Sequence, residues 1–319
     1  MYKSDVEAVD GLARAYQNLR QEISKIIVGQ DDVVRAVLIS LFSNGHSLLV
    51  GVPGLAKTLL VSTISDVLDL EFKRIQFTPD LMPSDITGSE IFDENKTFKF
   101  NKGPLFSNIV LADEINRTPP KTQAALLEAM QERSVTVSGI KHILAQPFFV
   151  LATQNPIEQE GTYPLPEAQL DRFMFNIYLG YPSYEEEVDV VKRTTSVRDI
   201  ELKSVLNHQE ILFFQNLVRK IPIADNVLEY AVTLASKTRP GTTLATPEIN
   251  NYISWGAGPR ASQYLVLGAK CHAAIQGKYS PDIEDVKAIA EYVLSHRVVR
   301  NYKAEAEGVS ISNIIQNLL

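Results

Sequence analysis

The sequence predicts an α/β protein in which a parallel sheet with helices on both faces is followed by an all-helical domain. Up to about Pro182, short apolar runs alternate with amphipathic helical stretches, a pattern typical of a parallel sheet. Beyond that point only helical periodicity is found. The 319 residues fit two domains at roughly 100–200 residues per domain. We therefore expect domains at residues 1–182 and 183–319.

Four apolar runs in the first domain have the length and flanks of buried strands, namely Ser47–Val50, Ile109–Ala112, Phe148–Thr153 and Phe173–Leu179. A fifth segment, Phe72–Phe77, the second in chain order, is strand-like. Apolar residues at helical spacing predict helices over Val6–Ile26, Asp31–Ser43 and Lys57–Leu68. Another helix follows the third strand, and we expect Thr118 to cap it and Pro119 and Pro120 to open it.

Two predicted hairpins interrupt this alternation. The first spans Glu90–Phe100 with its turn at Asp93–Lys96, and the second spans Ser134–Leu144 around Gly139. In the second domain, helices are expected over Glu185–Thr195, His208–Ile221, Asp225–Lys237, Pro259–Gln276 and Asp282–His296, with a short one near Ser312.

Composition narrows the classes of protein to consider. The net charge is −7 and the pI about 5.4, which does not favour nucleic-acid binding, although an acidic total can conceal a basic patch. The single cysteine, Cys271, excludes an internal disulfide and fits a reducing compartment. Neither a signal peptide nor a long apolar span is found, so we expect a cytoplasmic protein.

A phosphate-binding loop follows the first strand and opens a helix. Glycines let such a loop fold around an anion, while its N–H groups and the helix N-terminus point at the phosphates. Lys57 would reach the β and γ phosphates of ATP, and the Thr58 hydroxyl would bind Mg²⁺. Ala56 stands where glycine is usual, and we expect negative φ there because the helix begins at this position. A glycine-rich turn without a ligand is the alternative. The candidate nucleotide-binding residues are Gly51, Val52, Pro53, Gly54, Leu55, Ala56, Lys57, Thr58 and Leu59.

Two carboxylates end the third strand. In parallel sheets, ligands bind at the carboxyl ends of the strands. Asp113 would hold Mg²⁺ through its water shell, and Glu114 would act as the base on the attacking water. A strand that simply ends in solvent is the alternative, and the nearby phosphate loop argues against it.

Three further residues are candidates for hydrolysis. Asn155 follows the fourth strand and could orient the attacking water, or merely cap the turn before Pro156. Arg172 ends a short helical stretch and fits an arginine finger supplied to a neighbouring subunit, with a surface arginine as the alternative. Arg260 lies in the first turn of a helix, an unfavourable place for a cation that suggests a phosphate-binding role, with a helix start that carries an exposed arginine as the alternative.

Together these residues resemble the MoxR family of AAA+ ATPases. The resemblance spans essentially the whole chain, and Ala56 fits this family. The segments that carry it are Gly51–Thr58, Leu111–Arg117, Ala125–Arg133, Ala152–Pro156, Gly161–Phe173 and Gly258–Ala261, of which Gly161–Phe173 is the most specific.

The resemblance implies a P-loop αβα sandwich with a parallel five-stranded core and a helical lid, assembled as a ring that we expect to be hexameric. It assigns Asn155 as first sensor, Arg172 as finger and Arg260 as second sensor, acting in cis or in trans. It also places Val28 and Gly29 in the adenine pocket. Family members resemble chaperones that use ATP to mature partner proteins, often ones with von Willebrand factor A domains, and sometimes to insert metal cofactors.

Three readings of the function follow. The first is an ATP-driven machine that remodels proteins. The second is a nucleic-acid motor, for which the hairpins offer Lys96, Lys99, Lys102 and Lys141, although Asp93 and Glu94 lie among them. The third is a nucleotide-dependent scaffold with little turnover, against which the intact Lys57 and Glu114 argue.

Overall fold

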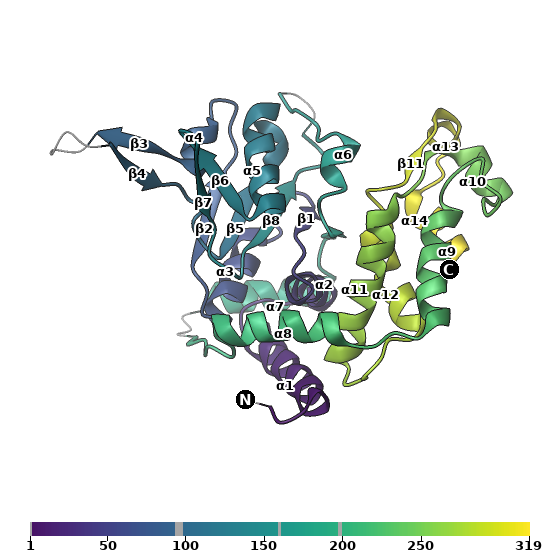
Figure 1. The fold of residues 1–319 in the computed structure, drawn as a ribbon, viewed down its shortest axis with the longest axis horizontal. Helices are drawn as coiled ribbons and strands as arrows, with labels where there is room; N and C mark the ends of the chain where they lie inside the picture. Colours follow the sequence, from purple (N-terminus) through teal and green to yellow (C-terminus); the bar gives the residue numbers. More distant parts are fainter. Residues whose placement is uncertain (1, 93–97, 159–160, 197–199) are drawn as a thin grey trace.

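The core of the protein is a five-stranded parallel sheet between two helical layers (Figure 1). The computed structural model describes residues 2–92, 98–158, 161–196 and 200–319. Each strand pairs in parallel with its neighbour, so all carboxyl ends lie at one edge of the sheet. In spatial order the strands are β2 (Phe72–Gln76), β5 (Ile109–Asp113), β8 (Phe149–Gln154), β1 (Ser47–Val50) and β9 (Phe175–Tyr178).

Both faces of β1, β5, β8 and β9 are largely buried, which explains why these strands are mostly apolar, whereas Lys73, Arg74 and Gln76 of the edge strand β2 are exposed. In β5, Val110 and Ala112 pack into one apolar cluster, whereas Ile109 and Leu111 pack into the other. The first cluster lies under α5 (Pro120–Glu132). The second also contains apolar residues of α1 (Asp5–Ser24), α2 (Asp31–Phe42) and α3 (Lys57–Val67).

Two antiparallel hairpins project from the core, as the sequence predicts. β3 (Gly88–Phe92) pairs with β4 (Phe98–Lys102), and β6 (Ser134–Val137) pairs with β7 (Ile140–Ile143). The predicted turn at Asp93–Lys96, with Lys96 of the basic set, lies outside the described residues. The second hairpin turns through Ser138 and Gly139, both with positive φ, as a two-residue hairpin turn requires. The short helix α4 (Pro83–Thr87) leads into the first hairpin.

The second part of the chain is helical, with one addition. A small antiparallel ribbon formed by β10 and β11 joins the predicted helices. The elements are α7 (Tyr184–Thr194), α8 (His208–Lys220), α9 (Asp225–Lys237), α10 (Pro247–Tyr252), β10 (Ile253–Trp255), α11 (Pro259–Ile275), α12 (Ile283–Leu294), β11 (Val299–Arg300), α13 (Tyr302–Ala306) and α14 (Ile311–Leu318). The division at residue 182 stays a prediction, and α8 packs against both α1 and α2.

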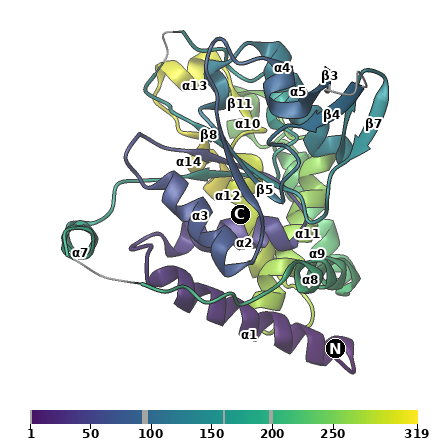
Figure 2. The same cartoon turned by 90° about the vertical axis from the view of Figure 1, so that its left-hand side faces the viewer.

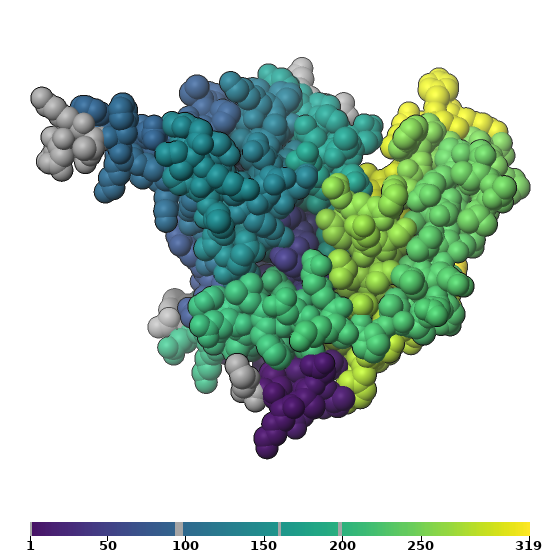
Figure 3. All heavy atoms as spheres, in the orientation of Figure 1, coloured from purple at the N-terminus to yellow at the C-terminus, as the bar shows by residue number. Residues whose placement is uncertain are grey.

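Helices α9 to α14 stand beside the core, while α8 runs beneath it (Figures 1 and 2). α7 lies at the end of α1, where Arg193 donates to the carbonyl of Ser24 at 3.0 Å. A hollow separates the upper parts of the core and of this helical lid (Figure 3). The two parts meet where α12 packs on the edge strand β9, with the rings of Phe175 and Tyr292 5.6 Å apart. Arg297, just beyond α12, donates to the carbonyls of Phe173 and Met174.

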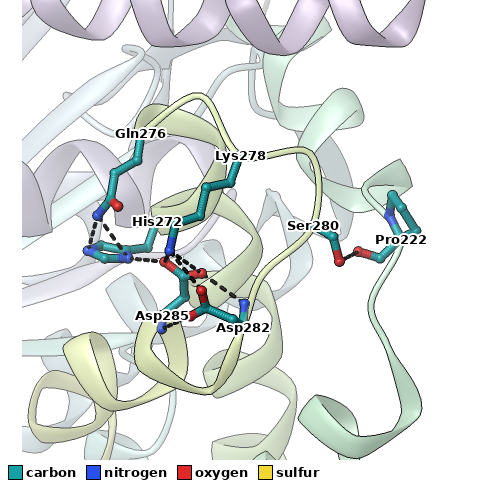
Figure 4. A network of polar contacts seen from close by, with 7 residues as sticks. All are labelled: Pro222, His272, Gln276, Lys278, Ser280, Asp282 and Asp285. Atoms are coloured by element: carbon teal, nitrogen blue, oxygen red, sulfur yellow. Dashed lines mark hydrogen bonds and ion pairs between the residues drawn. The ribbon is translucent and has the colours of Figure 1, made fainter.

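A buried polar network fixes the crossing of α11 and α12 in the lid (Figure 4). The Asp285 carboxylate is fully buried and lies 2.8 Å from His272 Nδ1 and 3.2 Å from Lys278 Nζ. Burial alone would raise the pKa of Asp285, but the bonds from His272, from the N–H of Asp282 and from Lys278 hold it below its ordinary value. The network therefore holds one charge-paired carboxylate inside the lid.

Two local predictions are wrong. The helix α5 begins at Pro120 with Pro119 as its N-cap, whereas Thr118 ends the 3₁₀ turn of Ile115–Arg117 (η1) and does not cap α5. The predicted helix that ends in Arg172 is the single turn α6 (Glu167–Leu170), so Arg172 lies two residues beyond it.

Candidate functional site

The phosphate loop has the backbone of an anion cradle. It connects β1 to α3, and Gly54 has φ +87 with open space where a side chain would project. Ala56 has φ +54, so our expectation of negative φ at this position is wrong. Ala56 precedes the first turn of α3 as its N-cap in the left-handed region, where a non-glycine residue is strained. Glycine is usual at this position because it adopts positive φ without strain, whereas Ala56 adopts the same φ at a cost.

Lys57 is the first residue of α3 and its side chain folds back over the loop. Its Nζ donates to the carbonyl oxygens of Gly51, at 2.5 Å, and Val52, at 3.2 Å. Burial lowers the pKa of Lys57, and the negative charges of Asp113 and Glu114 oppose this shift. The lysine thus lies within the electrostatic reach of both predicted carboxylates.

Asp113 and Glu114 are joined through one hydroxyl at the end of β5. Thr153 Oγ1, on the adjacent strand β8, donates to Asp113 Oδ1 at 2.6 Å and accepts from the N–H of Glu114 at 2.8 Å. Glu114 has φ +58, a left-handed conformation that is costly for a glutamate. Such strain is typical of functional sites, and here the Thr153 bond holds the residue that carries it.

Three residues of neighbouring elements bind the two carboxylates. Arg74 of β2 donates from Nε at 3.0 Å and from Nη2 at 2.7 Å to Asp113 Oδ2. Gln76 and Arg117 donate to Glu114 Oε2 at 2.8 and 3.0 Å. The bond to Glu114 raises the pKa of Arg117. In this structure both acids are therefore held by other side chains of the chain.

The amide of Asn155 and the predicted adenine segment lie beside the same loops. Asn155 follows β8, is buried, and its Oδ1 accepts from the N–H of Ile157 at 3.2 Å, a local bond of the turn. Gln30 Nε2 donates to the carbonyl oxygen of Leu55 at 3.2 Å, so the segment that contains Val28 and Gly29 is tied to the phosphate loop. The structure thus brings these predicted groups to the edge where the strands end.

Arg172 and Arg260 lie elsewhere. Arg172 precedes β9, at the edge of the sheet where the strands begin. Two residues later, the N–H of Met174 donates to the carbonyl of His46, which directly precedes β1. The four residues of β1 therefore separate Arg172 from the phosphate loop by roughly 13 Å. The side chains of Arg172 and Arg260 line one cavity of about 180 Å³ together with Arg133 and Tyr264.

Comparisons with known proteins agree with this architecture. The model of the ATPase family associated with various cellular activities (AAA) matches residues 46–175, and that of the AAA lid domain matches residues 248–318. The Chaperone MoxR1 of Mycobacterium tuberculosis is 42% identical over 97% of this chain and 83% of the relative. The chain belongs to the MoxR family of AAA+ ATPases.

Two further relatives also match nearly the whole of this chain. The protein YeaC of Bacillus subtilis is 42% identical over 94% of this chain and 91% of its own length. The crystal structure of a putative ATPase from Cytophaga hutchinsonii superposes with a TM-score of 0.92 at 42% identity, covering 98% of this chain and 95% of that one. A MoxR-type P-loop core followed by a helical lid is thus the fold of this chain.

Several site residues escaped the sequence analysis. Thr153, Arg74 and Gln76 reach the acids because β2, β5 and β8 are neighbours in the sheet, although the bonded residues are 38 to 40 positions apart in the chain. Their signal in the sequence is weak: Arg74 and Gln76 alternate with Ile75 on a strand-like segment, a pattern that does not distinguish a functional side chain from an ordinary exposed one. Asp171 was read as part of a motif without a role of its own.

Two kinds of feature are absent from the described ranges. None of their helices is long and apolar enough to cross a membrane. None of their His, Cys, Asp and Glu side chains form a group of three or more that could hold a metal ion.

Proposed function

We propose that this chain binds ATP with Mg²⁺, hydrolyses it as a member of a ring of copies, and uses the cycle to remodel partner proteins. The observation that carries the proposal is the convergence of Lys57, Asp113 and Glu114 at the strand ends beside the P-loop, with Thr153 bonded to both acids. Family membership implies the use of a nucleotide, and this cluster supports its hydrolysis.

The donors present fit Mg²⁺ better than a metal that needs a full protein cage. Thr58, in the first turn of α3, and Asp113 supply oxygen atoms, and Mg²⁺ is usually held by one or two such ligands with phosphate oxygens and waters completing the set. The absence of a larger acidic group in the described ranges agrees with this. When bound, the ion would neutralise charge on the β and γ phosphates.

The chain's own groups divide the remaining work. Lys57 exchanges its bonds to two loop carbonyls for the phosphates, which are better acceptors for a cation. Both bonds to Glu114 reach Oε2, which leaves Oε1 to accept the proton of the attacking water. Asn155 orients that water once its local bond to Ile157 is given up.

The two remaining arginines act on the nucleotide of a neighbouring copy. Because Arg172 starts at the opposite edge of the sheet, its side chain is too short to reach the P-loop of its own chain. Arg260 lines the same cavity, so the same reasoning favours action in trans for both. This requires a closed ring, which we propose to be a hexamer.

The proteins acted on are proposed from the family alone. One relative is named a chaperone, and we propose that this chain likewise matures or activates protein complexes, with von Willebrand factor A domain proteins as candidate partners and metal insertion as a candidate outcome. A cytoplasmic location is part of the same proposal and rests on the single, buried cysteine.

The test is steady-state ATP hydrolysis by the wild type and by Glu114→Gln, with molar mass recorded with and without ATP and Mg²⁺. We expect turnover in the wild type, its loss in the variant with nucleotide binding kept, and assembly that depends on ATP. Equal turnover in both proteins would remove Glu114 as the base. Binding without turnover in either would favour a scaffold.

A nucleic-acid motor is tested in the same preparation. The described hairpins present Lys99, Lys102 and Lys141. If they bind nucleic acid, affinity for single- or double-stranded DNA will fall steeply with salt, and reversing these three charges will abolish it. We expect no such binding.

A further inference from the structure

One carboxylate ties the core to two separate helices of the lid. Asp171 directly precedes Arg172 in the core. Its Oδ2 accepts from Arg260 Nη1 at 2.8 Å, at the start of α11, and its Oδ1 accepts from Arg297 Nε at 2.8 Å, just beyond α12. Its main-chain oxygen accepts a further bond from Arg297 Nη2 at 2.9 Å. Asp171 therefore connects the start of α11 and the residues just beyond α12 to the core segment that contains Arg172, the proposed arginine finger.

Arg297 restricts movement at this connection between the lid and the core. Its side chain is 1% exposed, and its other bonds reach the carbonyls of Phe173, Met174 and Val293. The adjacent His296 adds a bond from Nε2 to the carbonyl of Phe173 at 3.1 Å. A buried guanidinium with all these partners leaves the segment little freedom to move relative to α12.

The position of Arg260 at a helix N-terminus makes an acidic partner such as Asp171 favourable. It lies in the first turn of α11, where the helix dipole is positive, and the N-cap Gly258 offers no side chain to the free N–H groups. A cation on a long, flexible side chain would otherwise turn away from this helix end into solvent. The bond to Asp171 offsets the local repulsion and selects one orientation.

That orientation places Arg260 beside Arg172. Both side chains line the cavity of about 180 Å³, where Tyr264 of α11 also reaches the main-chain oxygen of Arg172 at 3.5 Å. Arg133 lines the cavity too, and the only carboxylate bonded to these groups, that of Asp171, is shared between Arg260 and Arg297 in the described residues. The excess positive charge suits an anion, and the paired side chains point to a phosphate of a second copy.

We infer that Asp171 is a positioning residue that locks the lid arginine Arg260 beside the core arginine Arg172, so that both reach the phosphates of a neighbouring copy's nucleotide as one unit. The inference rests on the proposed function, which assigns both arginines to that nucleotide. Because Asp171 is held by α11 and by the segment after α12, movement of the lid carries the finger with it.

The test uses mixed rings. Asp171→Asn subunits keep an intact P-loop, so binding of a fluorescent ATP analogue should stay within about twofold of the wild type, while kcat falls roughly 10–100-fold because the arginines are misplaced. Mixing with Lys57→Ala subunits, whose arginine face is intact, should restore turnover. Mixing with Arg172→Ala subunits should not. Asp171→Glu should keep more turnover than Asp171→Asn, because it keeps the charge.

Two controls separate positioning from general structure. Glu284→Gln removes a carboxylate from an exposed lid ion pair with Lys287 and should leave turnover unchanged. In an Arg260→Ala background, Asp171→Asn should cost less than about threefold in kcat, since the group it positions is already gone. If Asp171→Asn does not fold, the same measurements are made with Asp171→Asn/Arg297→Met, which removes the stranded buried charge.

The inference is overturned if Asp171→Asn turns over like the wild type, if its defect is as large without Arg260, or if Lys57→Ala subunits do not rescue it. The proposed function fails separately. In that case Lys57→Ala and Arg172→Ala subunits, mixed as a reference, would also show no recovery.

Discussion

Removing Arg74 should tighten the binding of Mg²⁺, because this arginine occupies the carboxylate that the ion needs. Both of its bonds reach Asp113 Oδ2, and the two side chains are 48% and 12% exposed. Two unit charges about 4 Å apart attract by about 4 kcal/mol at an effective dielectric constant near 20. Solvent screening of the half-exposed Arg74 reduces this to about 1 kcal/mol.

A competitor of that strength should shift the Mg²⁺ requirement about fivefold, since 1.4 kcal/mol corresponds to about a factor of ten. We therefore expect Arg74→Gln to lower the Mg²⁺ concentration for half-maximal binding of a fluorescent ATP analogue about fivefold. The titration is made in the Glu114→Gln background, so that no nucleotide is consumed. Lys73→Gln is the matched control, because it removes the same charge from the same strand, where its partner is Glu71 at 3.7 Å.

An unchanged or higher Mg²⁺ midpoint in Arg74→Gln would refute this reasoning. It would mean that Arg74 supports the site in the bound state instead of competing for it. An equal shift in Lys73→Gln would show a general effect of net charge, with no contribution from the contact to Asp113.

The remaining predictions concern single residues. Lys57→Ala should abolish tight ATP binding, and micromolar affinity retained in equilibrium titration would defeat the P-loop assignment. Gly29→Ala should weaken nucleotide binding about tenfold, because φ is +69 and the new Cβ would lie 2.3 Å from Glu186 Cδ. A Kd equal to that of the wild type would show that this segment does not contact the base. Burial lowers the pKa of His46 to about 3 and that of His296 well below 6.5, so both bind protons only after unfolding. As the pH falls below 6.5, the free energy of unfolding should therefore decrease by up to about 1.4 kcal/mol per pH unit for each histidine. His46→Gln should reduce the slope of the free energy of unfolding, measured with a chemical denaturant, against pH. An unchanged slope would contradict the burial argument.

Much of the fold and the local part of the site could be predicted from the sequence. The P-loop is contiguous, so Gly51 to Thr58 carry their chemistry in one short run, and the buried strands are apolar on both faces. Ala56 shows where this reasoning stops. Its φ of +54 depends on how the loop meets α3, which residue type alone does not determine.

The rest depends on contacts between distant segments. Asp171 meets Arg260 89 residues away and Arg297 126 residues away, and nothing in their local patterns links the three. Arg74 likewise meets Asp113 39 residues away through strand pairing. The order of strands in the sheet, which apolar runs alone do not give, decides which polar side chains share an edge.

The packing of α12 on β9 also bears on solubility. A strand at the margin of a sheet exposes main-chain groups on which another chain can pair. Here the lid covers that margin: Tyr292 lies over Phe175, and Arg297 occupies the carbonyls of Phe173 and Met174. A fragment reduced to the sandwich would expose the edge of β9 and its apolar residues Phe175 and Ile177, so we expect this fragment to self-associate more readily than the whole chain.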